Sequence, residues 1–153
     1  MTAVTEGAPA PNFTLETADG PVSLGDFKGK TLVLYFYPKD DTGGCTKEAQ
    51  GFTELAPEFA KAGVGIVGVS KDSIASHKKF TAKYSLGVPL GSDPEGRVIE
   101  AYGSWVEKSL YGRKYMGIDR STFLIQDGVL RKIWRKVRVP GHVDAVLDAA
   151  KAL

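Results

Sequence analysis

The apolar run Thr31–Tyr37 limits the possible folds of this chain more than any other feature. It is uninterrupted by charge, which is typical of a strand buried on both faces at the centre of a helix-covered sheet. A second such run, Val64–Ser70, follows. The stretch between them, Thr46–Ala62, carries apolar residues at helical spacing, at Phe52, Leu55, Phe59 and Ala60. Buried strands that alternate with a helix predict an α/β fold.

The rest of the chain extends this pattern. Asp19-Gly20-Pro21 predicts a hairpin near the N-terminus, and Asp127-Gly128 predicts one between strands 120–126 and 129–137. We expect helices over 73–83 and 142–152, a short strand over 88–91, and a short helix that starts at Asp93. We also expect a loop over 105–116, a loose first dozen residues, and a bend or break at Pro57. The sum is a central mixed β-sheet flanked by helices, with an N-terminal hairpin extension.

Size and charge favour one ordinary domain over residues 1–153. The net charge of +2 is too small to indicate a nucleic-acid partner. The basic stretch 131–138 is interpreted as a strand with one wet face. No apolar run approaches the roughly 20 residues that span a bilayer, and Met1–Gly7 does not resemble a signal peptide. We therefore expect a cytoplasmic protein with no membrane partner.

Cys45 is the only cysteine, and it lies where a predicted strand leads into a predicted helix. The free N–H groups and the positive dipole end of a helix N-terminus favour thiolate over thiol, and the thiolate is the nucleophile. The alternative is a buried cysteine that acts as a small hydrophobe. The flanking Pro38, Thr42 and Gly43-Gly44 are not core-packing residues, so the sequence favours a reactive thiol.

The sequence contains no convincing pattern for a metal or cofactor site. His77 and His142 lie on predicted helices outside any cluster of ligands, so we expect surface or helix-end roles, no metal site and no Cys–His hydrolase. The glycines of Gly63–Gly68 match the spacing of a dinucleotide fingerprint but run into a strand, whereas the fingerprint follows a strand and opens a helix.

Pro38, Thr42 and Cys45 have the spacing Pro-x-x-x-Thr-x-x-Cys, which resembles the active-site signature of peroxiredoxins. The segments 35–49, 92–96, 111–118 and 120–125 look like the bacterioferritin comigratory protein, or Q, subfamily. The resemblance covers nearly the whole chain. It implies a thioredoxin-like fold and a thiol peroxidase that needs no metal, haem or flavin.

The resemblance assigns roles to six residues. Cys45 attacks the peroxide, and Arg120 is the active-site arginine, whose guanidinium favours the thiolate and can donate to peroxide oxygens. Thr42 can hydrogen-bond substrate or cap the helix, and Pro38 can shield the sulfur or simply end the strand. Backbone N–H groups at Gly44 and Cys45 can bind an oxyanion. Glu48 resembles the position that orients the arginine; the alternative is a solvated helix carboxylate.

The chain departs from the subfamily at the positions of a second cysteine, which hold Gln50 and, by alignment by eye, Thr81. No internal thiol can then resolve a sulfenic acid. This absence, natural or engineered, implies a one-cysteine cycle with an external reductant, or a disulfide between two Cys45 residues. Gly43 stands where the family usually has proline, which predicts a looser first helical turn.

The predicted function is reduction of hydrogen peroxide and alkyl hydroperoxides, with Cys45 recycled by a thioredoxin, glutaredoxin or glutathione system. We expect a monomer or weak dimer. The alternatives are a peroxide sensor or redox relay that uses the same cysteine, and a thioredoxin-like binding module with an inert thiol.

Overall fold

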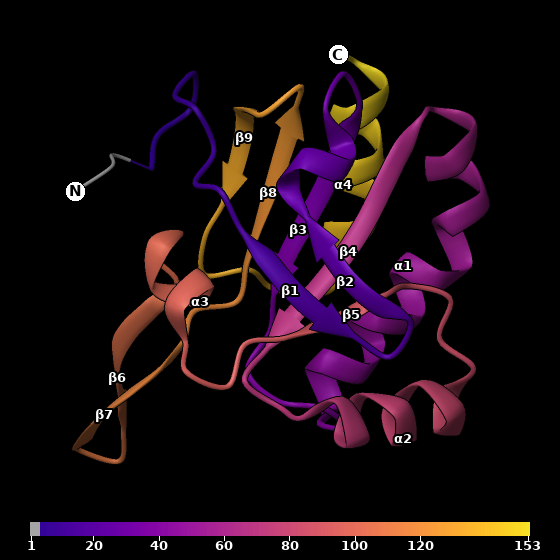
Figure 1. Ribbon diagram of the computed structural model, residues 1–153. Helices are drawn as coiled ribbons and strands as arrows, with labels where there is room; N and C mark the ends of the chain where they lie inside the picture. The colour runs from indigo at the N-terminus through magenta and orange to yellow at the C-terminus, as the bar shows by residue number, and fades with distance from the viewer. Residues whose placement is uncertain (1–3) are drawn as a thin grey trace.

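A central sheet forms the body of the protein in the computed structural model, which describes residues 4–153 (Figure 1). Its strand order is β2-β1-β5-β4-β3-β8-β9. The strands are β1 (Thr14–Thr17), β2 (Gly20–Ser23), β3 (Thr31–Phe36), β4 (Val64–Ser70), β5 (Leu90–Ser92), β8 (Ser121–Gln126) and β9 (Val129–Trp134). Strands β3, β4 and β5 are parallel, and the other pairs are antiparallel. The predicted mixed sheet is confirmed, and the N-terminal hairpin β1–β2 extends its edge.

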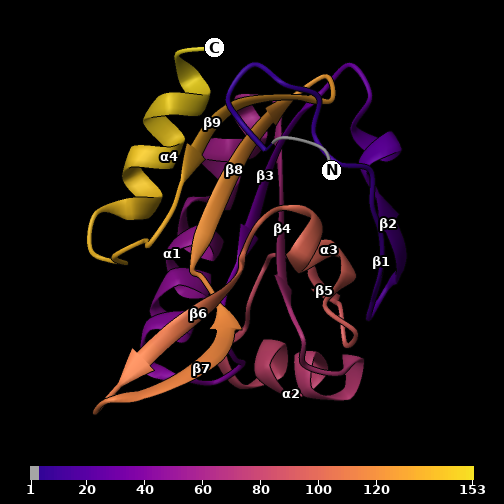
Figure 2. The ribbon, with the colours of Figure 1, turned by 90° about the vertical axis from the view of Figure 1, so that its left-hand side faces the viewer.

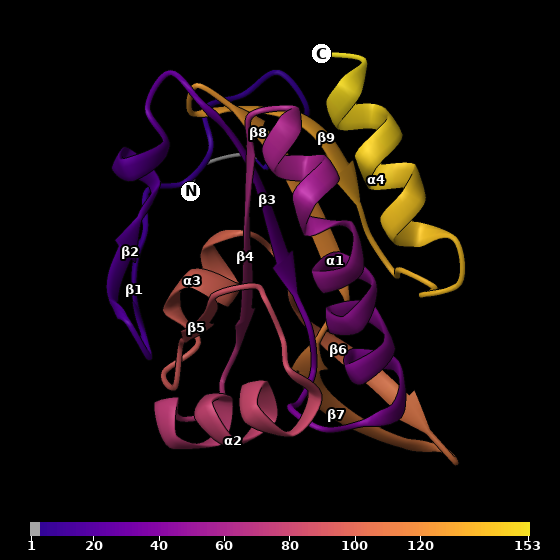
Figure 3. The same cartoon turned by 90° about the vertical axis from the view of Figure 1, so that its right-hand side faces the viewer.

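Helices cover both faces of the sheet. They are α1 (Gly43–Lys61), α2 (Ile74–Tyr84), α3 (Arg97–Ala101) and α4 (His142–Lys151), with a 3₁₀ turn, η1, at Leu24–Phe27. Residues of α1, α2 and α4 pack with Val33, Tyr35 and Tyr37 of the β3 region. Figures 2 and 3 show α1 and α4 on one side of the sheet and α3 on the other.

Strand β3 supplies buried side chains to both cores, as its unbroken apolar sequence predicts. Tyr35 and Tyr37 face α1, while Leu34 and Phe36 face the opposite core with Phe123. Each is at most 1% exposed. Burial of a large apolar side chain contributes about 1.5–3 kcal/mol, so this strand is a main source of stability.

The hairpin between β8 and β9 is confirmed. Asp127 and Gly128 have φ values of 47° and 77°, as a two-residue type I′ turn requires. The predicted strand beyond Trp134 is wrong, because β9 ends there.

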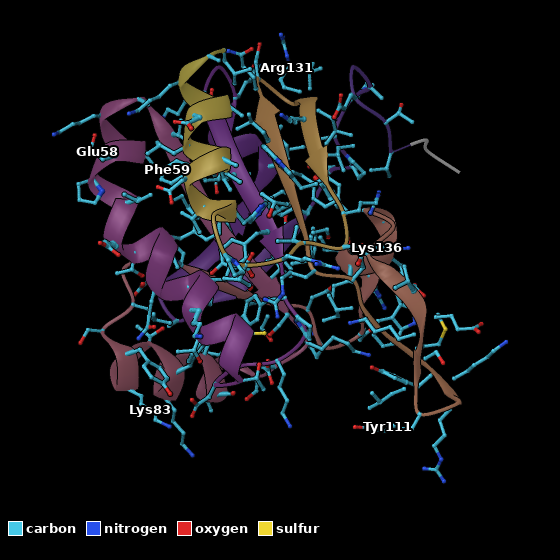
Figure 4. All side chains as sticks on the ribbon, turned by 180° about the vertical axis from the view of Figure 1, so that it is seen from behind. Glu58, Phe59, Lys83, Tyr111, Arg131 and Lys136 are labelled. Atoms are coloured by element: carbon cyan, nitrogen blue, oxygen red, sulfur yellow. The ribbon has the colours of Figure 1, made fainter. Side chains whose placement is uncertain are left out.

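The predicted loop over 105–116 is wrong: this segment forms a separate two-stranded sheet of β6 (Trp105–Leu110) and β7 (Arg113–Ile118). Tyr111 and Gly112 form its turn, with φ values of 51° and 78°. Most of the hairpin has no buried face, so its sequence shows no apolar alternation. Figure 4 shows Tyr111 at the tip, well away from the body of the protein, and its side chain is 97% exposed.

The start of the helix predicted at Asp93 is also wrong. Helix α3 begins at Arg97, after Gly96 with φ 74°. The Asp93 carboxylate nevertheless accepts a hydrogen bond from the Ile99 N–H at 2.9 Å. It therefore satisfies a free N–H group in the first turn of α3, although it lies outside the helix.

The N-terminal segment is not loose where it is described. The Gly7 N–H donates to the Leu130 carbonyl at 2.7 Å, and the Leu130 N–H donates to the Ala8 carbonyl at 2.9 Å. These bonds fix the segment along β9, and residues 1–3 of the prediction lie outside the described part. Helix α1 continues past the exposed Pro57, so no break occurs there.

Across residues 4–153, the helices are too short or too polar to cross a bilayer.

Candidate active site

The loop from β3 to α1 places Cys45 in the first turn of the helix. Strand β3 ends at Phe36, and α1 begins at Gly43, with Thr42 at the N-cap position. Cys45 is the third residue of the helix and is 1% exposed. The sulfur therefore sits in the first turn, where the free N–H groups and the dipole favour negative charge.

Arg120 reaches this turn from the position just before β8, the strand next to β3 in the sheet. Strand β8 runs antiparallel to β3 with Phe36 opposite Ser121, so Arg120 lies where β3 ends. Its Nη2 donates to Cys45 Sγ at 3.2 Å, and its Nη1 donates to Glu48 Oε1 at 2.8 Å. Burial lowers the pKa of Arg120, but the charges of Glu48 and Cys45 outweigh burial and raise it overall. One guanidinium thus serves two acidic groups.

Glu48 is fully buried, so the alternative of a solvated carboxylate is wrong. Burial raises the pKa of Glu48 to about 7, against the opposing effect of Arg120. Cys45 and Glu48 compete for one positive charge, and a proton on Glu48 leaves more of that charge for the sulfur.

Gly44 lets the guanidinium approach the backbone. A Cβ atom at Gly44 would lie 3.1 Å from Arg120 Nη2, closer than ordinary van der Waals contact. Gly43 differs, because a Cβ there would meet nothing within 4 Å. The two adjacent glycines therefore have different roles in the first turn.

Thr42 occupies the N-cap position, but its hydroxyl does not cap the helix. The hydroxyl donates to the Lys39 carbonyl at 2.9 Å. Its oxygen can still accept a hydrogen bond, and the residue is exposed. Pro38 is half-buried at the start of the same loop and offers no N–H to solvent or substrate.

A buried network anchors this loop to α2. Asp40 accepts hydrogen bonds from Tyr37 at 2.6 Å and from Ser76 at 2.8 Å, and it pairs with His77 Nδ1 at 2.8 Å. His77 Nε2 lies 3.1 Å from the Gly91 carbonyl. The expectation of a surface or helix-end role for His77 is wrong, because this histidine is buried within α2 and holds the active-site loop.

Asp41, with φ 57°, forms a second anchor at the surface. It accepts from Lys83 at 2.7 Å and from Tyr84 at 2.6 Å, both at the end of α2. Lys83 lies on the outer side of α2 in Figure 4. Sequence reasoning missed both anchors, since the partners are 36 to 43 residues apart.

His142 begins α4, and its buried ring lies near Arg120. Its Nε2 lies 2.8 Å from the Thr122 hydroxyl, and the Trp134 ring packs edge-on at 5.7 Å. Burial, and then the charge of Arg120, lower the pKa of His142 to about 4. The Val137 N–H donates to the Arg120 carbonyl at 2.9 Å, so the segment before α4 also supports the arginine.

Within residues 4–153, no three histidine, cysteine, aspartate or glutamate side chains gather as a metal site would need.

The arrangement of a helix-terminal cysteine, an arginine and a buried glutamate can be compared with known proteins. The AhpC/TSA family model matches residues 7–133. The putative peroxiredoxin bcp of Coxiella burnetii is 52% identical over 92% of this chain and 95% of its own. A PrxQ cysteine-to-serine variant from Xylella fastidiosa superimposes with a TM-score of 0.93 at 37% identity, over 99% of this chain and 98% of its own.

A third relative, the bacterioferritin comigratory protein of Xanthomonas campestris, was solved in work on its alkyl peroxide reduction activity. It superimposes with a TM-score of 0.87 at 46% identity, over 92% of this chain and 90% of its own. The fold and the site define a thioredoxin-fold thiol enzyme. The chain belongs to the AhpC/TSA family and, within it, to the Bcp/PrxQ peroxiredoxins.

Proposed function

We propose that Cys45 is the peroxidatic residue of this peroxiredoxin and that it reduces hydrogen peroxide and alkyl hydroperoxides. The observation that carries the proposal is the 3.2 Å hydrogen bond from Arg120 Nη2 to the sulfur in the first turn of α1. Alkyl peroxide reduction by the Xanthomonas campestris relative supports this substrate class.

The proposed reaction begins with attack of the Cys45 thiolate on one peroxide oxygen. A sulfur–oxygen bond forms as the O–O bond breaks, and the departing alkoxide or hydroxide takes up a proton. The guanidinium of Arg120 can donate to the peroxide oxygens as negative charge develops on them. The Thr42 oxygen accepts the hydroxyl hydrogen of the substrate, and the backbone N–H of Gly44 contributes a further donor. Pro38 limits access of water to the sulfur.

The sulfenic acid on Cys45 is then reduced by an external thiol, because the chain contains no second cysteine. Two thiols become a disulfide and the oxygen leaves as water. We place this cycle in the cytoplasm, where thiols are kept reduced. A thioredoxin, glutaredoxin or glutathione system supplies the thiols, and the enzyme works as a monomer or weak dimer.

Peroxide consumption by the wild type and Cys45→Ser tests the proposal. The wild type should consume peroxide in the presence of thiol, and Cys45→Ser should not; consumption by the variant contradicts the proposal. Intact mass after one equivalent of peroxide should show a sulfenic acid or a Cys45-linked dimer. An excess should give sulfinic acid, since no internal thiol intercepts the first product.

A screen of reductants distinguishes the enzyme from a sensor or relay. A peroxidase turns over many times with at least one small thiol or thiol protein. A relay instead reacts once with peroxide and passes its oxidation to one protein partner.

A further inference from the structure

Two buried polar atoms on the α1 side of the sheet have no hydrogen-bond partner among residues 4–153. They are the Tyr35 hydroxyl oxygen and Glu48 Oε2. Both side chains are 0% exposed. Buried polar groups almost always have a hydrogen-bond partner in the protein or in an ordered water, so we expect one for each of these two atoms. The two atoms do not bond each other directly. A carboxylate oxygen can accept and a phenol can donate, so one water between them can join the two.

The packing brings the two side chains into one layer. Phe52 lies one helical turn after Glu48, so both occupy the same face of α1. The Tyr35 ring stacks on Phe52, with centroids 4.6 Å apart and an interplanar angle of 24°. Tyr35 also lies over Gly68 of β4, where a Cβ atom would come within 2.7 Å of the phenol oxygen. A glycine at that position makes the room that the hydroxyl needs.

The charges around the phenol agree with this placement. Burial raises the pKa of Tyr35, and among the neighbouring charges that of Glu48 raises it most, followed by those of Cys45 and Asp40. Arg120 acts in the opposite direction. The charge of Arg120 also acts on His142 of α4. The phenol therefore lies in the electrostatic surroundings of the Cys45–Arg120–Glu48 cluster.

We propose that Tyr35 is a positioning residue, whose hydroxyl is linked to Glu48 Oε2 through one bridging water and so fixes the carboxylate that holds Arg120 against Cys45. Through this water, a donor is directed at the carboxylate, which stabilises its ionised form. Tyr35 does not touch the peroxide. The proposal rests on the proposed function of Cys45 and adds a fourth member to the Cys45–Arg120–Glu48 cluster.

Tyr35→Phe tests the proposal, because it keeps the stacked ring and removes only the hydroxyl. The rate constant for peroxide reduction should fall about tenfold, as loss of a hydrogen bond to a charged group predicts. The Glu48 ionisation in the pH profile of that rate should move to higher pH, because the ionised carboxylate loses a donor. The control is Tyr102→Phe, which removes a buried hydroxyl that donates to the Pro11 carbonyl at 2.6 Å. Its rate and profile should match the wild type.

A double-mutant cycle shows whether Tyr35 acts through Glu48. In a Glu48→Gln background, Tyr35→Phe should cause little further loss. Additive losses, or a wild-type rate and profile in Tyr35→Phe, overturn the proposal while peroxide reduction by the wild type stands. A wild type that reduces no peroxide overturns the proposed function instead.

A crystal structure of the wild type provides a test that needs no variant. A Tyr35 hydroxyl bonded to Glu48 Oε2, directly or through one water, supports the proposal. A different partner for either atom overturns it.

Discussion

Arg120 Nη2 lies 3.2 Å from Cys45 Sγ, although 75 residues separate the two in the chain. The contact depends on the antiparallel pairing of β3 with β8, which sets Phe36 opposite Ser121. The first turn of α1 places the sulfur locally, whereas the arginine reaches it only when β3 and β8 pair. The hydrogen bond from the arginine to the sulfur therefore requires the folded sheet.

Arg120 should act through its planar pair of donors as well as its charge. Nη1 binds Glu48 and Nη2 binds Cys45, and a lysine ammonium cannot reproduce this fork. We expect Arg120→Lys to reduce peroxide about tenfold to a hundredfold more slowly, and Arg120→Met to be slower still. Stopped-flow measurement of the peroxide step gives both rate constants. A wild-type rate in Arg120→Met would refute the role of the arginine.

The sequence predicts the position of Cys45 well, because the strand and helix on either side have clear patterns. Arg120 and Glu48 could be assigned only through a family motif, since their contacts join α1 to the segment before β8. The Asp40–His77 pair and the burial of His142 carry no local signal at all. The β6–β7 hairpin was missed because most of its residues face solvent, which removes the alternation that marks a strand.

The two glycines before Cys45 should respond differently to alanine. At Gly44 the added methyl would lie 3.1 Å from Arg120 Nη2 and displace the guanidinium, whereas at Gly43 it meets nothing within 4 Å. We expect Gly44→Ala to slow peroxide reduction several-fold. Gly43→Ala should leave the rate unchanged and stabilise the fold by about 0.4–1 kcal/mol. Equal rates in the two variants would show that the arginine moves aside freely.

Gly43→Pro should stabilise the protein by about 0.4–1 kcal/mol, because proline restricts the unfolded chain. Gly43 is the first helical residue, and Thr42 before it has φ −111° and ψ 157°, an extended conformation that precedes proline readily. A stiffer first turn should slow reduction of the sulfenic acid by the external thiol more than it slows peroxide attack. Stopped-flow of the two half-reactions, with Gly43→Ala as control, measures this. Equal rates of reduction in both variants would contradict a role for flexibility.

Glu48 and His142 should oppose each other in the pH dependence of stability. Burial raises the pKa of Glu48 from 4.5 to about 7, so its contribution to stability is lost as the pH rises through that window. Burial lowers the pKa of His142 from 6.5 to about 4, so its contribution is lost as the pH falls through that window. Each shift corresponds to about 3 kcal/mol, and solvent screening reduces the figure for the less buried His142.

Because the two windows overlap between about pH 4.5 and about pH 6.5, these residues should leave the free energy of unfolding of the wild type nearly constant over that range. His142→Gln retains a polar group for Thr122 and removes one titration, so this variant should become more stable on acidification. Glu48→Gln should become less stable on acidification, because only the histidine then titrates. Urea unfolding of the three proteins at each pH measures the slopes. Parallel slopes in the two variants would show that neither group titrates in the expected window.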